Sequence, residues 1–173
     1  MLPSSLSPLT TELSWKELHL DVATMKQIEE IKARFKHSSI KPGYRVLFHG
    51  TSATVKAIAA LIGKEYNRYV YQVDLSKLVK KYIGETEKKL NRLFDKAEDK
   101  NWILFFDEAD ALFGKRTGVR DAHEKYANQE VAYLLQRIED YNGLIILASN
   151  MKKNIDNAFT RRLNSVIHFS PSS

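Results

Sequence analysis

The fold is decided by the stretch Trp102-Ile-Leu-Phe-Phe-Asp-Glu-Ala-Asp110. Its apolar run, over 102–106, predicts a strand buried on both faces, and the run ends directly at Asp107 and Glu108. In an open α/β sheet, side chains that follow the carboxyl ends of the strands reach the edge where ligands bind. The stretch therefore predicts a helix-covered parallel sheet with two carboxylates at its ligand-binding edge. The alternative, a solvated acidic turn, fits poorly because the apolar run draws the strand inward.

A second motif lies upstream, in Gly50-Thr-Ser-Ala-Thr-Val-Lys-Ala57. Laid on the phosphate-binding pattern G-x-x-x-x-G-K-[ST], it keeps Gly50 and Lys56 but has Val55 at the second glycine and Ala57 at the hydroxyl position. A predicted strand precedes the motif and a predicted helix follows it, which is the order that a phosphate-binding loop requires. The candidate phosphate-binding residues are Gly50, Thr51, Ser52, Ala53, Thr54, Val55, Lys56 and Ala57.

Apolar segments of strand length alternate with helical patterns along the chain. This alternation predicts an α/β fold of three layers, in which a five-stranded parallel sheet carries helices on both faces. The strands are expected at 44–49, 68–73, 102–106, 144–148 and 166–169, and the helices at 24–37, 56–64, 75–80, around 90–97 and around 127–138.

The beginning of the chain is different in composition. Residues 1–14 are rich in Ser, Pro and Thr and are expected to form a flexible leader, so that the folded core is 15–173. Thr24-Met-Lys-Gln27 matches a capping box, which predicts that the first helix starts with Thr24 as its cap.

Composition places the chain in a broad class. It has 173 residues, 43% hydrophobic and 28% charged, which is typical of one soluble globular domain. The absence of cysteine excludes disulfides and thiolate metal sites. With no signal peptide and no long apolar segment, a cytoplasmic location is expected. The net charge of +6 is scattered among acidic residues, which favours a solvated surface over a nucleic-acid site.

Four motifs in order give a specific resemblance from about residue 15 to 169. The chain is similar to the ATPase core of the AAA+ family, and within it to the AAA clade of membrane-bound proteases, microtubule-severing enzymes and bacterial AAA ATPases. The first motif is the loop 50–57, where the family reads approximately G-P-P-G-T-G-K-T (Walker A), and the second is Lys81-Tyr-Ile-Gly-Glu-Thr-Glu87. The third is the Walker B pair, Asp107 and Glu108. The fourth is Leu144-Ile-Ile-Leu-Ala-Ser-Asn150, which is followed by Asp156-Asn-Ala-Phe-Thr-Arg-Arg162.

The resemblance implies ATP and Mg²⁺ as cofactors and assigns the site residues. Asp107 corresponds to the Mg²⁺ ligand, Glu108 to the residue that activates water, and Asn150 to sensor 1, which positions water and the γ-phosphate. Arg161 and Arg162 correspond to paired arginine fingers, presented to the nucleotide of a neighbouring subunit. Substrate polypeptide would be gripped by a pore loop with Tyr82, Ile83 and Gly84 at its tip.

Two of these assignments have simpler alternatives. Tyr82 could be an ordinary half-buried aromatic residue, but Gly84 and the glutamate after it are in register with the pore-loop pattern. Arg161 and Arg162 could neutralise the dipole at a helix C-terminus, and the surrounding Asp-x-Ala-Phe-x-Arg-Arg sequence makes this the weaker interpretation.

The Walker A loop departs from the family pattern. Such loops converge backbone N–H groups on phosphate oxygens, and Ala53 and Val55 stand where the family has glycine. Losing about three charge-assisted hydrogen bonds of roughly 1.5–3 kcal/mol each would offset most of the roughly 8 kcal/mol of a micromolar affinity. Ala57 cannot supply a hydroxyl ligand to Mg²⁺. We therefore expect nucleotide binding that is weakened or lost.

Two functions remain open after this comparison. The first is an AAA ATPase subunit of a protein-remodelling assembly, an ATP hydrolase by resemblance, with weakened or lost nucleotide binding. The second is a noncatalytic subunit that donates arginine fingers to an active neighbour. A DEAD-box helicase, suggested by Asp107-Glu-Ala-Asp110 and the basic pI, fails because such helicases resemble two domains in tandem.

The resemblance also implies an assembly and a fold. It implies a P-loop NTPase core in a homo- or hetero-oligomeric ring with other AAA subunits and a protein substrate. A membrane is not expected as a partner because no long apolar segment is present, and nucleic acid is disfavoured by the scattered charge. The helical lid that follows the fifth strand in the family is expected to be absent from these 173 residues.

Overall fold

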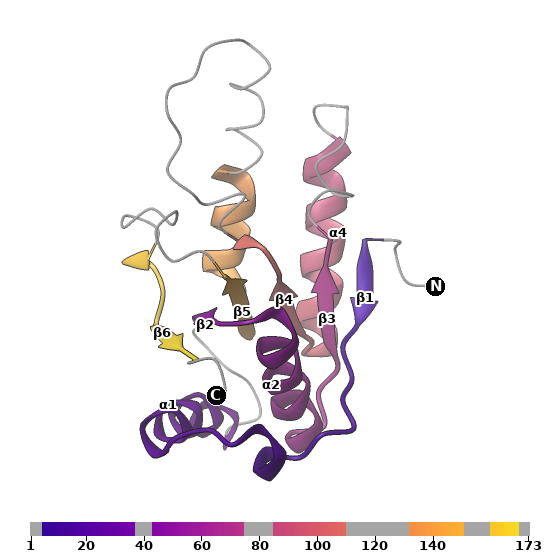
Figure 1. The fold of residues 1–173 in the computed structure, drawn as a ribbon. Helices are drawn as coiled ribbons and strands as arrows, with labels where there is room; N and C mark the ends of the chain where they lie inside the picture. Colours follow the sequence, from indigo (N-terminus) through magenta and orange to yellow (C-terminus); the bar gives the residue numbers. More distant parts are fainter. Residues whose placement is uncertain (1–4, 37–42, 75–84, 110–131, 151–159, 170–173) are drawn as a thin grey trace.

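The computed structural model of the chain describes residues 5–36, 43–74, 85–109, 132–150 and 160–169. These residues build one six-stranded sheet in the order β1-β3-β4-β5-β2-β6 (Figure 1). β1 runs antiparallel to β3, and the other neighbouring strands are parallel. The strands are β1 (Leu6–Pro8), β2 (Tyr44–His49), β3 (Val70–Val73), β4 (Ile103–Phe106), β5 (Leu144–Ser149) and β6 (Ser165–His168).

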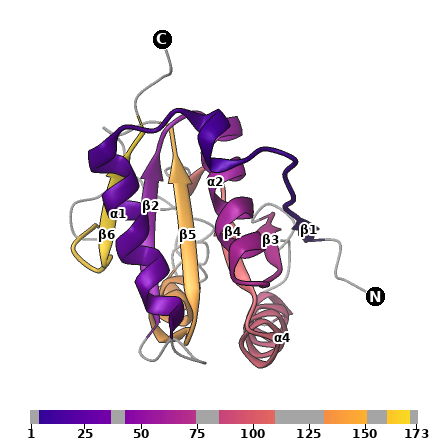
Figure 2. The same ribbon diagram turned by 90° about the horizontal axis from the view of Figure 1, so that it is seen from below.

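Helices cover both faces of this sheet. α1 and α2 lie on one face, and α4 lies with the helix over 132–140 on the other (Figures 1 and 2). The predicted three-layer α/β fold and its five parallel strands are thereby confirmed. The helix expected at 75–80 lies outside the described residues. The described helices are η1 (Trp15–Leu18), α1 (Val22–Lys32), η2 (Ala33–Lys36), α2 (Ser52–Glu65), α4 (Glu85–Lys100) and the helix over 132–140.

β4 shows why its sequence is apolar without interruption. Leu104 and Phe106 pack in the cluster beneath α4, whereas Ile103 and Phe105 pack in the cluster beneath α1 and α2. All four side chains are at most 1% exposed. Successive residues of a strand point to opposite faces, so a strand between two helical layers needs an apolar residue at every position.

The first residues differ from the expected flexible leader. β1 pairs with β3, where Leu6 lies opposite Val73, and the backbone N–H of Asp74 donates to the carbonyl of Ser5 at 2.7 Å. The Leu6 side chain is 7% exposed and belongs to the cluster beneath α4. A proline is tolerated in an edge strand, so Pro8 does not prevent this pairing. The serine- and proline-rich composition concealed a short sixth strand.

The start of α1 also corrects a prediction. The N-cap is Asp21, whose side chain accepts a hydrogen bond of 2.7 Å from the backbone N–H of Thr24. Thr24 is therefore the third residue of the helix and not its cap. Hydrogen bonds from Thr24 lower the pKa of the Asp21 carboxyl. Aspartate is as good an N-cap as serine or threonine, and the matching capping-box pattern three residues later was coincidental.

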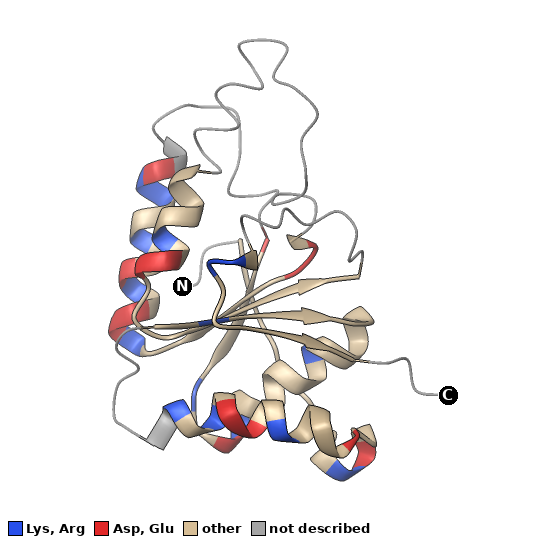
Figure 3. Cartoon of the chain, turned by 90° about the vertical axis from the view of Figure 1, so that its left-hand side faces the viewer, with Lys and Arg blue, Asp and Glu red and all other residues tan. Residues whose placement is uncertain are grey.

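Charged side chains are mixed over the helices. Figure 3 shows basic and acidic residues interleaved along α4 rather than gathered by sign. One such pair joins Asp95 of α4 to Arg137 of the helix over 132–140, with 2.9 Å between Oδ1 and Nη2. This mixture agrees with the interpretation of the net charge as solvated surface. In the part of the chain that the structure describes, each helix is too short or too polar to cross a membrane.

Candidate functional site

The carboxyl ends of three neighbouring strands bring the candidate residues together. β4, β5 and β2 are adjacent and parallel, with Phe106 opposite Leu147 and His49 opposite Ser149. The residues that follow these strands therefore lie at one edge of the sheet, and they include Asp107, Glu108, Asn150 and Gly50. The backbone N–H of Gly50 donates to the carbonyl of Ser149 at 3.3 Å, which ties β2 to β5 at this edge.

Helix α2 begins earlier than the sequence predicts. Its first residue is Ser52 with Thr51 as the N-cap, four positions before the expected start at Lys56. The backbone N–H of Val55 donates to the carbonyl of Thr51 at 3.1 Å, so this group is used inside the first turn. The segment between β2 and α2 consequently consists of Gly50 and Thr51 alone, which is shorter than the expected loop.

Val55 is a core residue of this helix. Its side chain is fully buried and packs in the cluster beneath α1 and α2. A Cβ added to Gly50 would lie 3.3 Å from Val55 Cγ1 and 3.0 Å from the Cβ of Phe169. A side chain at position 50 would therefore be crowded by Val55 and Phe169. The same two side chains fill the space at the end of β2 with apolar atoms.

Asp107 is engaged by residues of α2. Ser52 Oγ donates to Asp107 Oδ2 at 3.1 Å, and Lys56 Nζ lies 3.5 Å from the same oxygen. The backbone N–H of Glu108 donates to Asp107 Oδ1 at 2.8 Å. The structure therefore brings Lys56 and Asp107, two residues of the candidate nucleotide site, into contact. The contact from Ser52 was not predicted, because the motif places the hydroxyl after the lysine rather than at the start of the helix.

These residues fit Mg²⁺ and ATP only in part. A carboxylate such as that of Asp107 suits Mg²⁺, which prefers oxygen ligands. A phosphate group needs several convergent N–H groups, however, and a helix that starts at Ser52 uses its N–H groups from residue 55 onward in its own ladder, which leaves those of residues 52–54 at the helix start. Among the described residues, no group of three or more His, Asp or Glu side chains forms a further candidate metal site.

Glu108 has an unusual backbone conformation. Its φ is 53°, in the left-handed region, and its side chain is exposed. A residue other than glycine pays roughly 1–2 kcal/mol to adopt this conformation. Such strain is found most often at functional sites. The turn carries the chain sharply away from β4 and leaves the Glu108 carboxylate facing solvent.

Other candidate residues lie apart or outside the described chain. Asn150 follows β5 and is exposed at the same edge as Asp107. Tyr82, Ile83 and Gly84, the expected pore loop, lie outside the described residues. The alternative in which Tyr82 is an ordinary aromatic residue therefore stays open.

Arg161 and Arg162 lie near the amino end of β2, at the opposite end of the strand from Gly50. Both are exposed, in the segment 160–164 that precedes β6. β6 starts at Ser165 opposite Val46, near the amino end of β2, whereas Gly50 follows the carboxyl end. At about 3.3 Å per residue, the two ends of β2 are separated by roughly 16 Å. The arginines are therefore not placed beside the Asp107 of their own chain.

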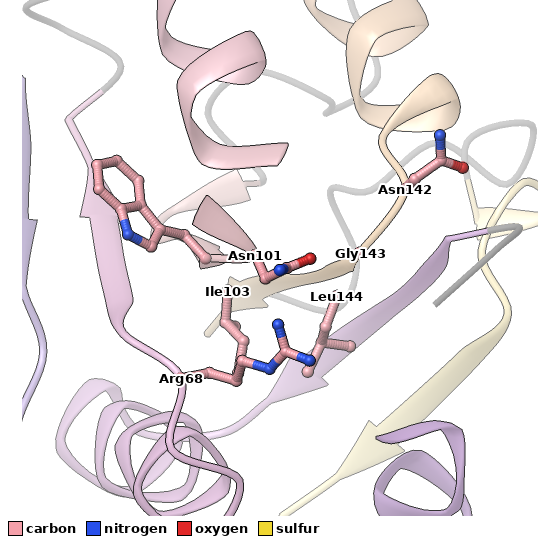
Figure 4. Close-up of a pocket in the computed structure, with 7 residues that line it drawn as sticks. Arg68, Asn101, Ile103, Asn142, Gly143 and Leu144 are labelled. Atoms are coloured by element: carbon pink, nitrogen blue, oxygen red, sulfur yellow. The ribbon is translucent and has the colours of Figure 1, made fainter. Parts of the chain in front are cut away.

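A small pocket also lies away from Asp107. It is formed at the amino ends of β4 and β5, where the side chain of Arg68 extends toward Leu144 close to Asn101 (Figure 4). Asn142 also lines the pocket. Ligands of open parallel sheets bind at the carboxyl ends of the strands. This pocket is therefore not part of the candidate site, and sequence patterns gave no signal for it.

Comparison with known proteins agrees with this geometry. The family model of the ATPase family associated with various cellular activities (AAA) matches residues 46–171. A putative cell division cycle ATPase of Plasmodium falciparum is 35% identical over 119 residues, covering 67% of this chain and 10% of that protein. A proteasome-associated ATPase of Nocardioides sp. is 33% identical over 150 residues, covering 73% of this chain and 25% of that protein.

Two further relatives cover nearly the whole chain. The cell division cycle protein 48 homolog of Archaeoglobus fulgidus is 29% identical, covering 98% of this chain and 25% of that protein. The crystal structure of the FIGL-1 AAA domain superposes with a TM-score of 0.70 at 22% identity, covering 96% of this chain and 57% of that chain. This chain thus spans a quarter or less of the length of the Plasmodium, Nocardioides and Archaeoglobus proteins named here, and 57% of the FIGL-1 chain. Because the family model covers well over half of its residues, the chain belongs to the AAA family of ATPases.

Proposed function

We propose that this chain is an AAA-type subunit of a protein-remodelling assembly in which nucleotide binding is weakened or lost. The observation that carries the proposal is the start of α2 at Ser52. The residues that would cradle phosphate form the first turn of a helix, and Val55 is fully buried within it. Binding ATP in the family's manner requires this turn to open.

The cost of opening can be estimated from Val55. Its three side-chain carbons contribute about 2.4 kcal/mol by burial, at about 0.8 kcal/mol per carbon. Each 1.4 kcal/mol lowers affinity tenfold, so exposing this side chain alone lowers affinity about fiftyfold. An affinity that would be micromolar in an intact loop then becomes roughly 50 μM before the missing phosphate contacts are counted.

The contacts of Asp107 support the same proposal. A bound Mg²⁺ would compete with Lys56 and Ser52 for Asp107 Oδ2. In the family's arrangement Asp107 would hold the metal, Glu108 would activate water and Asn150 would orient it. Ala57 offers no hydroxyl to complete the metal site. We propose that these residues keep their family positions but support little turnover.

The place in an assembly is proposed from the family. AAA proteins typically form rings, and two of the relatives are named as a proteasome-associated ATPase and a homolog of cell division cycle protein 48. These names support a protein as the substrate of the assembly. We propose a ring with other AAA subunits, with the pore loop of Tyr82, Ile83 and Gly84 directed to that substrate.

Turnover by the purified chain tests the proposed loss of activity. The rate of ATP hydrolysis is measured for the parent and for Glu108→Gln, which removes the proposed base. We expect both rates to be near background and equal. A parent that hydrolyses ATP well, beside an inactive Glu108→Gln variant, would show that the site is active and that the proposal is wrong.

The second candidate function is donation of arginine fingers to an active neighbour. It is favoured by the exposure of Arg161 and Arg162 at the edge opposite to Asp107, where they can meet another subunit. A guanidinium supplied from a neighbour accelerates related phosphoryl transfers by roughly 10³- to 10⁵-fold. This role does not depend on the nucleotide loop of the donor chain.

A mixing experiment tests the donor role. The chain is added to an AAA ATPase with intact motifs from the same cell, whose own arginine fingers have been removed, and turnover is measured. We expect the chain to restore activity and the Arg161→Ala/Arg162→Ala variant to fail. Arg137→Ala, which removes an arginine paired with Asp95 elsewhere, is the matched control and should restore activity fully. Equal restoration by the double variant would rule out the donor role.

A further inference from the structure

Arg45 links three parts of the chain at the amino end of β2. Its Nη1 donates to the carbonyl of Glu139 at 2.9 Å, near the end of the helix over 132–140. Its Nε donates to the carbonyl of Arg162 at 3.5 Å. One guanidinium group therefore joins β2, a helix C-terminus and the segment that carries Arg161 and Arg162.

The backbone of Arg45 holds the same segment. Its N–H donates to Asn164 Oδ1 at 2.8 Å, and its carbonyl accepts from the Asn164 backbone N–H at 2.8 Å. A backbone N–H of Leu163 donates to the carbonyl of Thr160 at 3.1 Å, which closes a turn over 160–163. Leu163 packs against the cluster beneath α4. The segment 160–164 is thus fixed by main-chain, side-chain and apolar contacts to β2.

The two arginines of this segment differ in their contacts. Arg162 Nη1 lies 3.2 Å from Glu139 Oε1, so its guanidinium is paired within the chain. Within the described residues, Arg161 has neither an ion pair nor a hydrogen bond from its side chain. The backbone carbonyl of Glu139 accepts a hydrogen bond from Arg45, and the carboxylate of Glu139 pairs with Arg162. Glu139 therefore contacts Arg45 and Arg162 at once.

We propose that Arg45 is a positioning residue for the segment 160–164, and that Arg161 rather than Arg162 is the arginine presented to a neighbouring subunit. The assignment of Arg161 rests on the donor role proposed above. Arg162 is directed along the chain's own surface by Glu139. Arg45, which lies on the strand that leads into the nucleotide segment at Gly50, fixes where Arg161 projects.

The absence of cysteine permits a direct test of the positioning. A spin label is attached to Arg161→Cys, and its mobility is measured by electron paramagnetic resonance in the full chain. Arg45→Leu and Arg45→Lys are introduced in turn; lysine keeps the charge but cannot bridge two carbonyls with a planar group. The matched control is Arg137→Leu, which removes an arginine that pairs with Asp95.

We expect both Arg45 variants to increase label mobility, with the spectrum shifting from an ordered to a largely mobile component, and the control to leave the spectrum unchanged. If Arg45→Leu fails to fold, the spectrum of Arg45→Lys alone tests whether the Arg45 guanidinium positions the segment 160–164. Identical spectra for the parent and Arg45→Lys would overturn the positioning role. An equal increase in the Arg137→Leu control would overturn it as well, since the effect would not be specific to Arg45.

The choice between the two arginines is tested in the mixed assembly. Arg161→Ala should reduce the restored turnover at least a hundredfold, whereas Arg162→Ala should reduce it less than tenfold. Equal losses for both variants would overturn the assignment of Arg161. A parent chain that restores no turnover, although its label is ordered by Arg45, would refute the donor role and the assignment of Arg161 together while supporting the positioning by Arg45.

Discussion

Replacing Val55 by glycine separates the two possible roles of this position. In the family pattern a glycine here belongs to a phosphate-binding loop, so Val55→Gly would repair the loop. In the structure Val55 is a fully buried residue in the first turn of α2. Val55→Gly should then remove core packing from a helix and restore little or no nucleotide binding.

The expected loss of stability follows from burial and helix propensity. Removing three buried carbons costs about 2.4 kcal/mol at about 0.8 kcal/mol each. Placing glycine in a helix costs a further 0.5 kcal/mol or so. We expect the free energy of unfolding of Val55→Gly to fall by about 3 kcal/mol. Ala53→Gly restores the other family glycine at an exposed position of the same turn, so it should cost at most about 1 kcal/mol.

Urea denaturation measures the free energy of unfolding of Val55→Gly and of Ala53→Gly, so the two losses can be compared directly. Unfolding is followed by the fluorescence of Trp102, which is 6% exposed and packs against Tyr71 with 4.3 Å between ring centroids. Calorimetric titration with ATP and Mg²⁺ is performed on each variant. If Val55→Gly is as stable as Ala53→Gly, or if it gains micromolar affinity for ATP, Val55 is a loop residue and our description of α2 is wrong.

Three further changes test packing elsewhere. Leu6→Ala should lower the free energy of unfolding by about 2–4 kcal/mol in urea denaturation, since Leu6 is 7% exposed in β1; a loss under 0.5 kcal/mol would restore the idea of a flexible leader. Gly43→Ala should cost about 1–3 kcal/mol or more in thermal unfolding, because its Cβ would lie 1.8 Å from the carbonyl oxygen of Tyr141, and an unchanged melting temperature would contradict that contact. Tyr141→Phe should cost about 1–3 kcal/mol, because the Tyr141 hydroxyl donates to the buried carbonyl of Trp102. Burial, followed by the charge of Glu98, raises the pKa of Tyr141 in the folded chain. The contribution of Tyr141 to the free energy of unfolding is therefore complete below the unfolded pKa of about 10 and declines as the pH rises above it. If the parent and Tyr141→Phe showed the same change in stability from about pH 9 to 11, this expectation would be refuted.

The architecture was largely predictable because its signals are local. A strand such as Ile103–Phe106 is apolar at every position since both of its faces are buried, and this pattern is visible without knowing its neighbours. The carboxylates of Asp107 and Glu108 follow the strand directly, so their placement at the sheet edge required only the parallel topology. The resemblance to the Walker B motif then gave the expected roles of the two residues, Mg²⁺ binding for Asp107 and activation of water for Glu108.

The errors occurred where distant residues decide the structure. Leu6 forms a strand because the edge of β3 and the cluster beneath α4 accept it, and its own neighbours in sequence give no periodic signal. The early start of α2 depends on Val55 reaching Gly50 and Phe169, which lie far from it in sequence or across the turn. Arg45 likewise contacts Glu139 and Arg162 through the tertiary fold alone.

Calorimetric titration of the unmodified chain with ATP and Mg²⁺ measures whether the segment after β2, which forms a helix start and packs in the core, binds nucleotide weakly. The loss of affinity expected from Val55 and from the missing phosphate contacts predicts no saturation below roughly millimolar nucleotide. A micromolar dissociation constant for ATP or ADP would show that this segment binds phosphate in spite of Val55 and Ala57.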